Sequence, residues 1–176
     1  MSYFTDRFYV KLDLETKEVL IKKELCEDML PNQIYHVTYN HDETKVLISA
    51  PPSHSNIQRL ILYNSTTSQV SRLDIMENPG EEVSLAKQQG FTDYFIYQTQ
   101  SESNSVLKKF HLASKHSETF SVLSQKNDRS SKFITCCIQQ LDKCFVVKLN
   151  SEKQQCSLQI YQMRLKKKVA NIKIDF

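Results

Sequence analysis

The sequence predicts an all-β protein, and three observations lead to this prediction. Short runs of β-branched and aromatic residues recur along the 176 residues, polar turns separate these runs, and helical periodicity is weak. Residues Val10 to Leu14 alternate apolar and charged side chains, as in a strand with one buried face. The best helix candidate, Glu81 to Gln89, is short. We therefore expect residues 1–176 to form a single all-β unit.

The composition fits a soluble globular unit with a core, because 40% of the residues are hydrophobic and 24% are charged. The net charge is +3 and both signs are mixed along the chain, so charge predicts neither a nucleic-acid nor a membrane partner. The two glycines, Gly80 and Gly90, are too few for a glycine-rich nucleotide loop or a G-x-S-x-G nucleophile elbow. The common nucleotide-binding and hydrolase motifs are therefore excluded.

The cysteines and the N-terminus favour a cytoplasmic protein. The five cysteines are odd in number and contain no C-x-x-C pair, so we expect reduced thiols and neither a disulfide framework nor a zinc site; they are Cys26, Cys136, Cys137, Cys144 and Cys156. The first residues lack the apolar core of a signal peptide, and no run approaches the ~20 apolar residues of a membrane span. A cytoskeletal or ciliary location fits equally, and the nucleus stays open.

Four segments share one pattern, an alternating strand followed by a polar turn and a second strand, and they cover residues 9–19, 60–70, 107–115 and 158–169. The equivalent positions recur at intervals of 51, 47 and 51 residues, and they are Leu12, Tyr63, Phe110 and Tyr161. Near-constant spacing indicates repeated hairpins, and a sheet made of them must stack on its neighbours to bury its faces. We expect all four residues to be buried between stacked sheets.

A second pattern precedes the last three hairpins, with an apolar strand, a polar turn and a more hydrophobic strand. Its equivalent positions, Val46, Tyr94 and Cys144, are 48 and 50 residues apart. The two patterns together predict antiparallel four-stranded meanders, with a partial repeat at about 1–25 and full repeats at about 32–76, 81–124 and 131–176. A β-sandwich with evenly spaced hairpins is the alternative.

These segments resemble the blades of WD-repeat β-propellers. Residues Val37 to Ser49 are similar to the middle hairpin of such a blade, where an apolar strand meets an Asn/Asp-rich turn and a more hydrophobic strand follows. Residues Leu62 to Val70 are similar to the segment that carries the family's Trp-Asp dipeptide, with Tyr63-Asn64 in its place. Since the chain has no Trp, the resemblance is to a divergent WD-repeat-like propeller, and it covers nearly the whole chain.

The resemblance implies three to four blades of an incomplete ring, because the first repeat supplies only an outer hairpin and propellers usually have about 4–8 blades. An open ring would expose a sheet edge. The missing strands would come from a longer protein, from a partner that completes the propeller, or from the C-terminal segment Val169 to Phe176, or else the ring is unusually small.

The resemblance also implies a non-enzymatic protein–protein interaction scaffold within a larger assembly, of ciliary or cytoskeletal, vesicle-coat or nuclear-pore type. We expect no catalytic residues, no cofactor and no metal. None of the five histidines has the H-E-x-x-H spacing of a zinc helix; they are His36, His41, His54, His111 and His116.

Two polar segments are candidate partner contacts, a loop and a basic hairpin turn, whose residues are Pro51, Pro52, His54, Arg164, Lys166, Lys167 and Lys168. Lysines at such a turn are also typical of a solvated turn that protects a sheet edge. Together with Tyr161 as a stacking platform, the basic turn supports an alternative function, a nucleic-acid-binding β-barrel module. We expect protein partners in a multi-subunit complex, and neither a membrane nor a nucleic acid.

Overall fold

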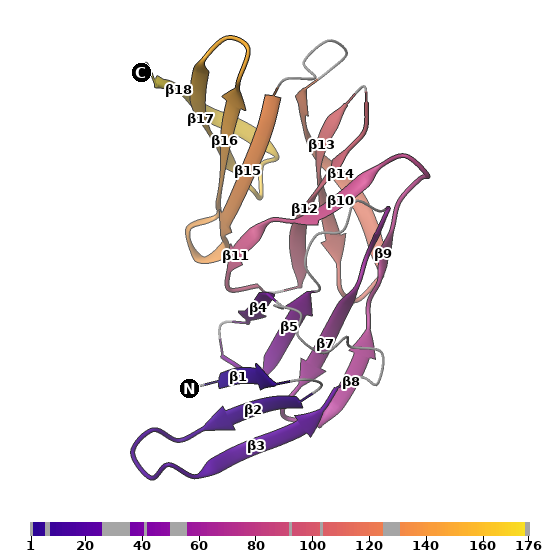
Figure 1. The fold of residues 1–176 in the computed structure, drawn as a ribbon, viewed down its shortest axis with the longest axis vertical. Helices are drawn as coiled ribbons and strands as arrows, with labels where there is room; N and C mark the ends of the chain where they lie inside the picture. The colour runs from indigo at the N-terminus through magenta and orange to yellow at the C-terminus, as the bar shows by residue number, and fades with distance from the viewer. Residues whose placement is uncertain are drawn as a thin grey trace.

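The computed structural model is built almost wholly of β-strands (Figure 1). It describes residues 2–5, 8–25, 36–40, 42–49, 56–91, 93–102, 104–124 and 131–174. Within these ranges the one helix is the 3-10 turn η1 (Gln139–Leu141), so the expected all-β fold is confirmed. The helix candidate Glu81 to Gln89 is wrong, because it forms two short strands. No helix of the described residues is long and apolar enough to cross a membrane.

The first two sheets hold the N-terminal half of the chain. The first sheet has three strands in the order β1 (Ser2–Thr5), β2 (Phe8–Leu12) and β3 (Val19–Glu24). The second sheet has four strands in the order β4 (His36–Tyr39), β5 (Lys45–Ser49), β7 (Leu60–Asn64) and β8 (Gln69–Arg72). Every pair of neighbouring strands in the two sheets is antiparallel.

The third and fourth sheets hold the C-terminal half. The third sheet has the order β10 (Glu82–Leu85), β12 (Tyr94–Gln100), β13 (Ser105–His111) and β14 (His116–Ser124). The fourth sheet has five strands in the order β11 (Lys87–Gln89), β15 (Ser131–Ile138), β16 (Lys143–Asn150), β17 (Gln155–Gln162) and β18 (Lys167–Ile174). Apart from the β11–β15 pair, all neighbouring strands in the two sheets are antiparallel.

Three shorter strands connect the sheets. A two-stranded ribbon forms from β6 (Ile57–Gln58) and β9 (Ile75–Met76) beside the second sheet. Strand β11 (Lys87–Gln89) lies between β10 and β12 in sequence but pairs in parallel with β15 of the fourth sheet. The hydroxyl of Thr38 on β4 donates a hydrogen bond of 3.4 Å to the carbonyl of Gln88, so β11 also contacts the second sheet.

The four sheets are stacked so that each consecutive pair encloses a core. Adjacent residues on one strand point into different cores, as expected from the two-residue period of a strand. On β5, Val46 contributes to the core against the first sheet and Leu47 to the core against the third. On β12, Phe95 contributes to the core against the second sheet and Ile96 to the core against the fourth. The middle sheets are therefore buried on both faces.

The hairpin turns explain why the chain needs so few glycines. Seven non-glycine residues of the described chain have a positive φ of 49° to 60°, and six of them end a hairpin turn; these six are Lys17, Glu43, Ser68, Lys115, Gln154 and Lys166. Side chains at the start of some turns hold the backbone, since the Oδ1 atoms of Asp13 and Asn64 each accept two backbone N–H groups. Side-chain caps thus replace the usual turn glycines.

Three of the four equivalent repeat positions are buried, and the fourth is not. Tyr63, Phe110 and Tyr161 are at most 5% exposed, and each contributes to the core against the preceding sheet. The expectation for Leu12 is wrong, because this side chain is only half-buried. Tyr9, three residues earlier, points into the core with the second sheet, so Leu12 points to the other face of the first sheet. A preceding sheet would lie on that face.

The stack does not close into a ring. In Figure 1 the first sheet and the fourth sheet lie at opposite ends of the long axis. The suggestion that Val169 to Phe176 completes the first sheet is wrong for its described part, because β18 pairs with β17. The first sheet instead takes its third strand from β1, which pairs with β2 along residues 2–5.

Candidate protein-interaction surface

The fourth sheet has one face against the third sheet and one face without a neighbouring sheet. We call the second one the outer face. Its side chains lie opposite one another in four rows across β15 to β18, which are Lys132–Leu149–Cys156–Ile174, Ile134–Val147–Leu158–Ile172, Cys136–Phe145–Ile160–Ala170 and Ile138–Lys143–Gln162–Lys167. The two middle rows contain no polar side chain except the Cys136 thiol. This face is therefore an apolar band across the whole sheet.

Much of this apolar band is accessible to solvent. Ile134 is 54% exposed, Ile172 is 49% exposed and Ile174 is 40% exposed. Val147 and Leu158, between them in the sheet, are half-buried. None of these residues belongs to a core cluster of the described chain. Contiguous exposed apolar side chains of this kind mark interaction sites in soluble proteins.

The opposite face of the same sheet is more polar, and its centre is buried. Residues Val146, Gln159 and Tyr161 are at most 8% exposed, and Thr135 beside them is also buried. Tyr161 donates a hydrogen bond of 2.7 Å to Gln159 Oε1, and Thr135 donates one of 3.4 Å to Gln98 of the third sheet. The third sheet therefore covers the centre of the more polar face, whereas the more apolar face points outward.

The charged groups on the outer face are all basic. Lys143 and Lys167 lie in the row at one end of the face, and Lys132 lies in the row at the other end. No Asp or Glu of the described residues occupies any of the four rows. The surface thus combines an apolar middle with positive charge at both ends.

The basic hairpin turn is only partly available as a predicted contact. Arg164, Lys166, Lys167 and Lys168 are all exposed at the β17–β18 turn. Lys166 Nζ lies 2.6 Å from a carboxylate oxygen of Glu118 on β14, so its charge is paired within the chain. Lys167 belongs to the outer face, whereas Lys168 lies opposite Tyr161 beyond a bulge. One residue of the predicted set therefore contributes to the surface that the structure reveals.

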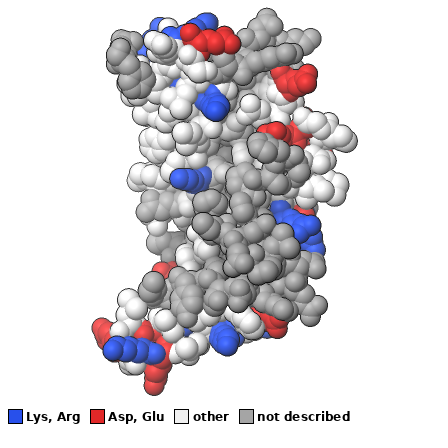
Figure 2. Space-filling model, in the orientation of Figure 1, with Lys and Arg blue, Asp and Glu red and all other residues white. Residues whose placement is uncertain are grey.

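The geometry of this turn contradicts the β-barrel alternative. Tyr161 is 2% exposed and its ring lies 5.9 Å from that of Phe120 in the core, so it offers no platform for a base. The described strands form separate stacked sheets, with no barrel. On the side of the molecule shown in Figure 2, blue and red groups are interspersed over the described surface. A β-barrel module that stacks bases on Tyr161 is therefore wrong for this chain.

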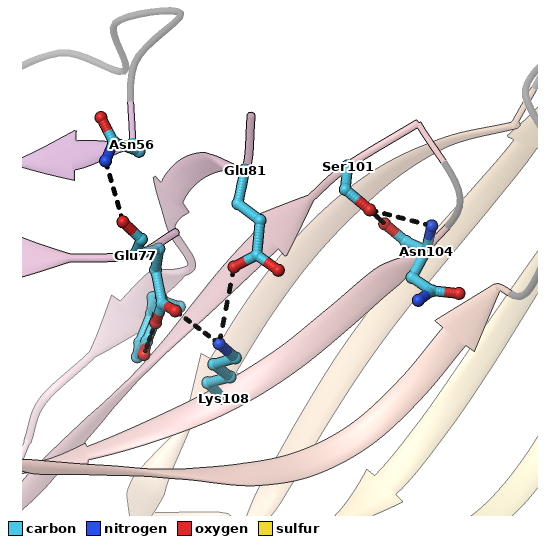
Figure 3. Close-up of polar contacts among 7 residues, drawn as sticks. Asn56, Glu77, Glu81, Ser101, Asn104 and Lys108 are labelled. Atoms are coloured by element: carbon cyan, nitrogen blue, oxygen red, sulfur yellow. Dashed lines mark hydrogen bonds and ion pairs between the residues drawn. The ribbon is translucent and has the colours of Figure 1, made fainter. Parts of the chain in front are cut away.

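The other predicted contacts, Pro51, Pro52 and His54, lie outside the described residues. The description resumes at Asn56, whose side-chain amide donates a hydrogen bond of 2.8 Å to the carbonyl of Glu77 (Figure 3). These three residues stay predicted contacts.

A largely buried charged cluster links the third sheet to the segment between β9 and β10 (Figure 3). Lys108 on β13 lies 2.6 Å from Glu77 and 3.9 Å from Glu81, and Tyr97 donates its hydroxyl to Glu77 at 2.5 Å. The side chains of Glu77 and Lys108 are 10% and 18% exposed. Burial and the hydrogen bond to Glu77 raise the pKa of Tyr97 well above its usual range. Lys108 pairs with both carboxylates, although the buried Oε2 atom of Glu81 has no hydrogen-bond partner, and we assign the cluster a structural role.

The cysteines and histidines form no ligand cluster that the structure can show. No group of three or more His, Cys, Asp or Glu side chains in the described residues could hold a metal ion. Cys137 and Cys144 lie directly opposite each other on β15 and β16, with their sulfur atoms 2.7 Å apart in the buried core. They are free thiols, and burial raises the pKa of Cys137. His111 lies 3.1 Å from Glu118 at the surface.

Comparison with known proteins identifies the fold. No family model matches the sequence, and no curated protein matches it. An oligogalacturonate lyase in complex with manganese matches 92% of this chain with a TM-score of 0.63 and 12% identity, and TolB from Acinetobacter baumannii matches 94% with a TM-score of 0.56 and 12% identity. Both are propeller proteins. The fold is that of a β-propeller.

The four sheets are thus propeller blades, and they form no closed ring. The chain spans 40% of the lyase and 39% of TolB, which is less than half the length of either protein. A second oligogalacturonate lyase, from Vibrio parahaemolyticus, is matched over 96% of this chain and 48% of its own length, with a TM-score of 0.51 and 15% identity. Identities this low establish the fold alone.

Sequence reasoning missed the outer face, although the sequence contains a signal for it. Residues Phe133 to Ile138, apart from Thr135, and Cys144 to Val147 are runs in which apolar residues follow one another without alternation. Such runs are typical of strands that are covered on both faces. Among the described residues no sheet covers the outer face of the fourth sheet, so part of these runs is exposed.

Proposed function

We propose that this chain is a non-enzymatic protein–protein interaction scaffold, a divergent WD-repeat-like set of propeller blades that works within a larger cytoplasmic assembly. Ciliary or cytoskeletal, vesicle-coat and nuclear-pore complexes are the classes of assembly that fit. The outer face of the fourth sheet carries this proposal. An apolar band that crosses a whole sheet, with Ile134 and Ile172 about half exposed at its two edges, is best covered by a partner protein.

The physical argument is the cost of leaving this face in water. Each apolar side chain that a partner removes from solvent stabilises the complex by roughly 25 cal/mol per Å² of buried apolar surface. Leu158 and Val147 lie opposite each other at the centre, and Ile134 and Ile172 continue the same row to the edges. A central apolar cluster with a polar rim is the usual anatomy of a protein interface.

The experiment compares two charged substitutions of exposed apolar residues. Ile172→Asp places a carboxylate in the apolar band of the outer face, where Ile172 is 49% exposed, and Leu165→Asp places one in the β17–β18 turn, where Leu165 is 65% exposed. Tagged full-length chains are expressed in the source cells, and their native mass is measured by size-exclusion chromatography. We expect wild type and Leu165→Asp to elute in an assembly and Ile172→Asp to elute at the mass of a single chain.

Two controls make the result interpretable. The melting temperatures of the purified variants are compared, because Ile172 and Leu165 are both exposed and should tolerate the charge without unfolding. Elution of the wild-type chain as a free monomer in cell extract contradicts the scaffold function. Binding of a single-stranded oligonucleotide with a steep salt dependence would indicate the nucleic-acid class instead.

A further inference from the structure

We propose that the outer face of the fourth sheet receives a second antiparallel β-sheet, from another polypeptide segment, with an apolar centre and acidic side chains at its ends. This inference rests on the proposed function and names the partner surface. Three observations carry it, namely the way the sheets of this chain stack, the dimensions of the outer face, and the sign of its charges.

The first observation is the repeated stacking of the sheets. Each consecutive pair encloses one core cluster. The rings of Tyr9 and Tyr63 lie 5.4 Å apart between the first and second sheets, and those of Phe120 and Tyr161 lie 5.9 Å apart between the third and fourth. The second and third sheets share the cluster that contains Leu47 and Phe95. The outer face is the same kind of surface as the third-sheet face that contains Ile96, which the fourth sheet covers. We therefore expect another sheet to pack on the outer face of the fourth sheet.

The second observation is the size of the surface. Strands β15 to β18, which form the outer face, have eight residues each, so this face is about 26 Å long at roughly 3.3 Å per residue and is four long strands wide. A sheet of the same dimensions, packed about 10 Å away, covers it completely. The matched propellers extend well beyond the matched segment, because this chain covers only 39% to 40% of two of them.

The third observation concerns charge and argues against packing of the outer face on the same face of a second copy. Lys143 and Lys167 lie at one end of the outer face and Lys132 at the other, and no described acidic residue shares the face. When the same face of two copies packs about a two-fold axis, lysine meets lysine at both ends. Like charges across an interface oppose binding, whereas acidic groups at those ends would pair with the lysines.

The experiment places a photoreactive amino acid, benzoylphenylalanine, at Ile172 or Ile134 of the full-length chain in the source cells. The matched control carries it at Leu165, which is apolar and exposed but lies in a turn away from the outer face. After irradiation the cross-linked peptides are sequenced by mass spectrometry. We expect both outer-face positions to cross-link to one segment of a different polypeptide, with alternating apolar residues and with Asp or Glu at the strand ends, and Leu165 to give no such product.

A charge-reversal pair tests the electrostatic part. Lys143→Glu with Lys167→Glu should lower the yield of the Ile134 cross-link by about tenfold, because each lysine then repels an acidic partner. Lys153→Glu with Lys115→Glu, which changes the same charge at exposed turns, should leave it unchanged. Both double variants are checked for an unchanged melting temperature.

The outcomes separate this inference from the proposed function. Cross-linking of Ile172 to a second copy of this chain, to a helical segment, or to nothing overturns the inference, and so does a yield that is insensitive to charge reversal at Lys143 and Lys167. If the wild-type chain still elutes in a large assembly in any of these cases, the scaffold function stands and only the partner surface is wrong. Elution of the wild-type chain as a monomer contradicts the proposed scaffold function itself.

Discussion

Lys166, in the β17–β18 turn of the fourth sheet, lies 2.6 Å from Glu118 on β14 of the third sheet. This ion pair joins the two sheets at the surface, outside their common core. His111 at 3.1 Å and Lys109 at 3.8 Å approach the same carboxylate. Three basic groups therefore surround one acid, and the Lys166 hydrogen bond, followed by that of His111, lowers the pKa of Glu118 to about 2.

The first prediction concerns acid stability. Because the pKa of Glu118 falls from 4.5 to about 2 on folding, its contribution to stability is present above the unfolded pKa and disappears as the pH falls through about 2. We expect wild type to be more stable than Glu118→Gln at about pH 6, with the difference closing between about pH 5 and about pH 2. Urea unfolding at several pH values measures this. A difference that does not depend on pH contradicts the assignment, and Glu152→Gln, in an exposed turn, is the control.

The second prediction concerns the charged cluster that Lys108 forms with Glu77 and Glu81. Lys108→Met leaves the carboxylates of Glu77 and Glu81 without their cation, so we expect a loss of about 3 kcal/mol in the free energy of unfolding. The double variant Lys108→Met, Glu77→Gln should recover part of this loss. Lys11→Met, which removes an exposed pair with Glu43 at 3.4 Å, should cost less than about 1 kcal/mol. Equal losses for the two lysines would show that Lys108 is not buried with its partners.

The third prediction concerns the left-handed turn residues. Gln154 has a φ of 50° at the end of the β16–β17 turn, where glycine has no steric penalty. We expect Gln154→Gly to raise the free energy of unfolding by about 0.5 kcal/mol, the net of relieved strain and greater freedom of the unfolded chain. Lys153→Gly in the same turn should lower it, because Lys153 is not among the residues with positive φ. Chemical denaturation measures both, and a destabilised Gln154→Gly would refute the turn geometry.

The fourth prediction concerns thiol reactivity. Cys136 points to the outer face and is half-buried, whereas Cys137 and Cys144 are fully buried and burial raises the pKa of Cys137. We expect iodoacetamide to modify Cys136 well before Cys137, Cys144 or Cys156 in the native chain. Peptide mass mapping over time gives the order.

Treatment with a chelator should leave the melting temperature unchanged, and a drop would reveal a structural metal.

Sequence reasoning predicted the fold class because the repeat leaves a clear trace. The interval between Tyr63, Phe110 and Tyr161 reflects one position in successive sheets, and all three residues are buried against the preceding sheet. Leu12 follows the same register, but no sheet of the described residues covers the face to which it points, and a periodic pattern cannot reveal this.

The candidate site was harder to predict than the fold. Composition drew attention to the charged turn at Lys166, but an ion pair with a residue 48 positions away cannot be read from local sequence. Sequence reasoning missed the outer face, because a largely apolar segment such as Phe133 to Ile138 has the same pattern whether or not another sheet covers the strand. Whether this face is exposed to solvent depends on which sheets pack beside the fourth sheet, and only the three-dimensional structure shows this.

Strand β11 couples the unfolding of three of the sheets, which independent repeats would not show. In most repeat arrays each unit touches only its neighbours, and an end unit can fray without affecting the middle. Here residues 87–89 leave the third sheet, pair with residues 136–138 of the fourth and accept a hydrogen bond from Thr38 of the second. Opening the fourth sheet therefore breaks main-chain bonds made by a segment that the second and third sheets also hold. These three sheets should exchange their amide hydrogens as one cooperative unit, and the long sequence separation of the β11–β15 pair should slow folding of the chain.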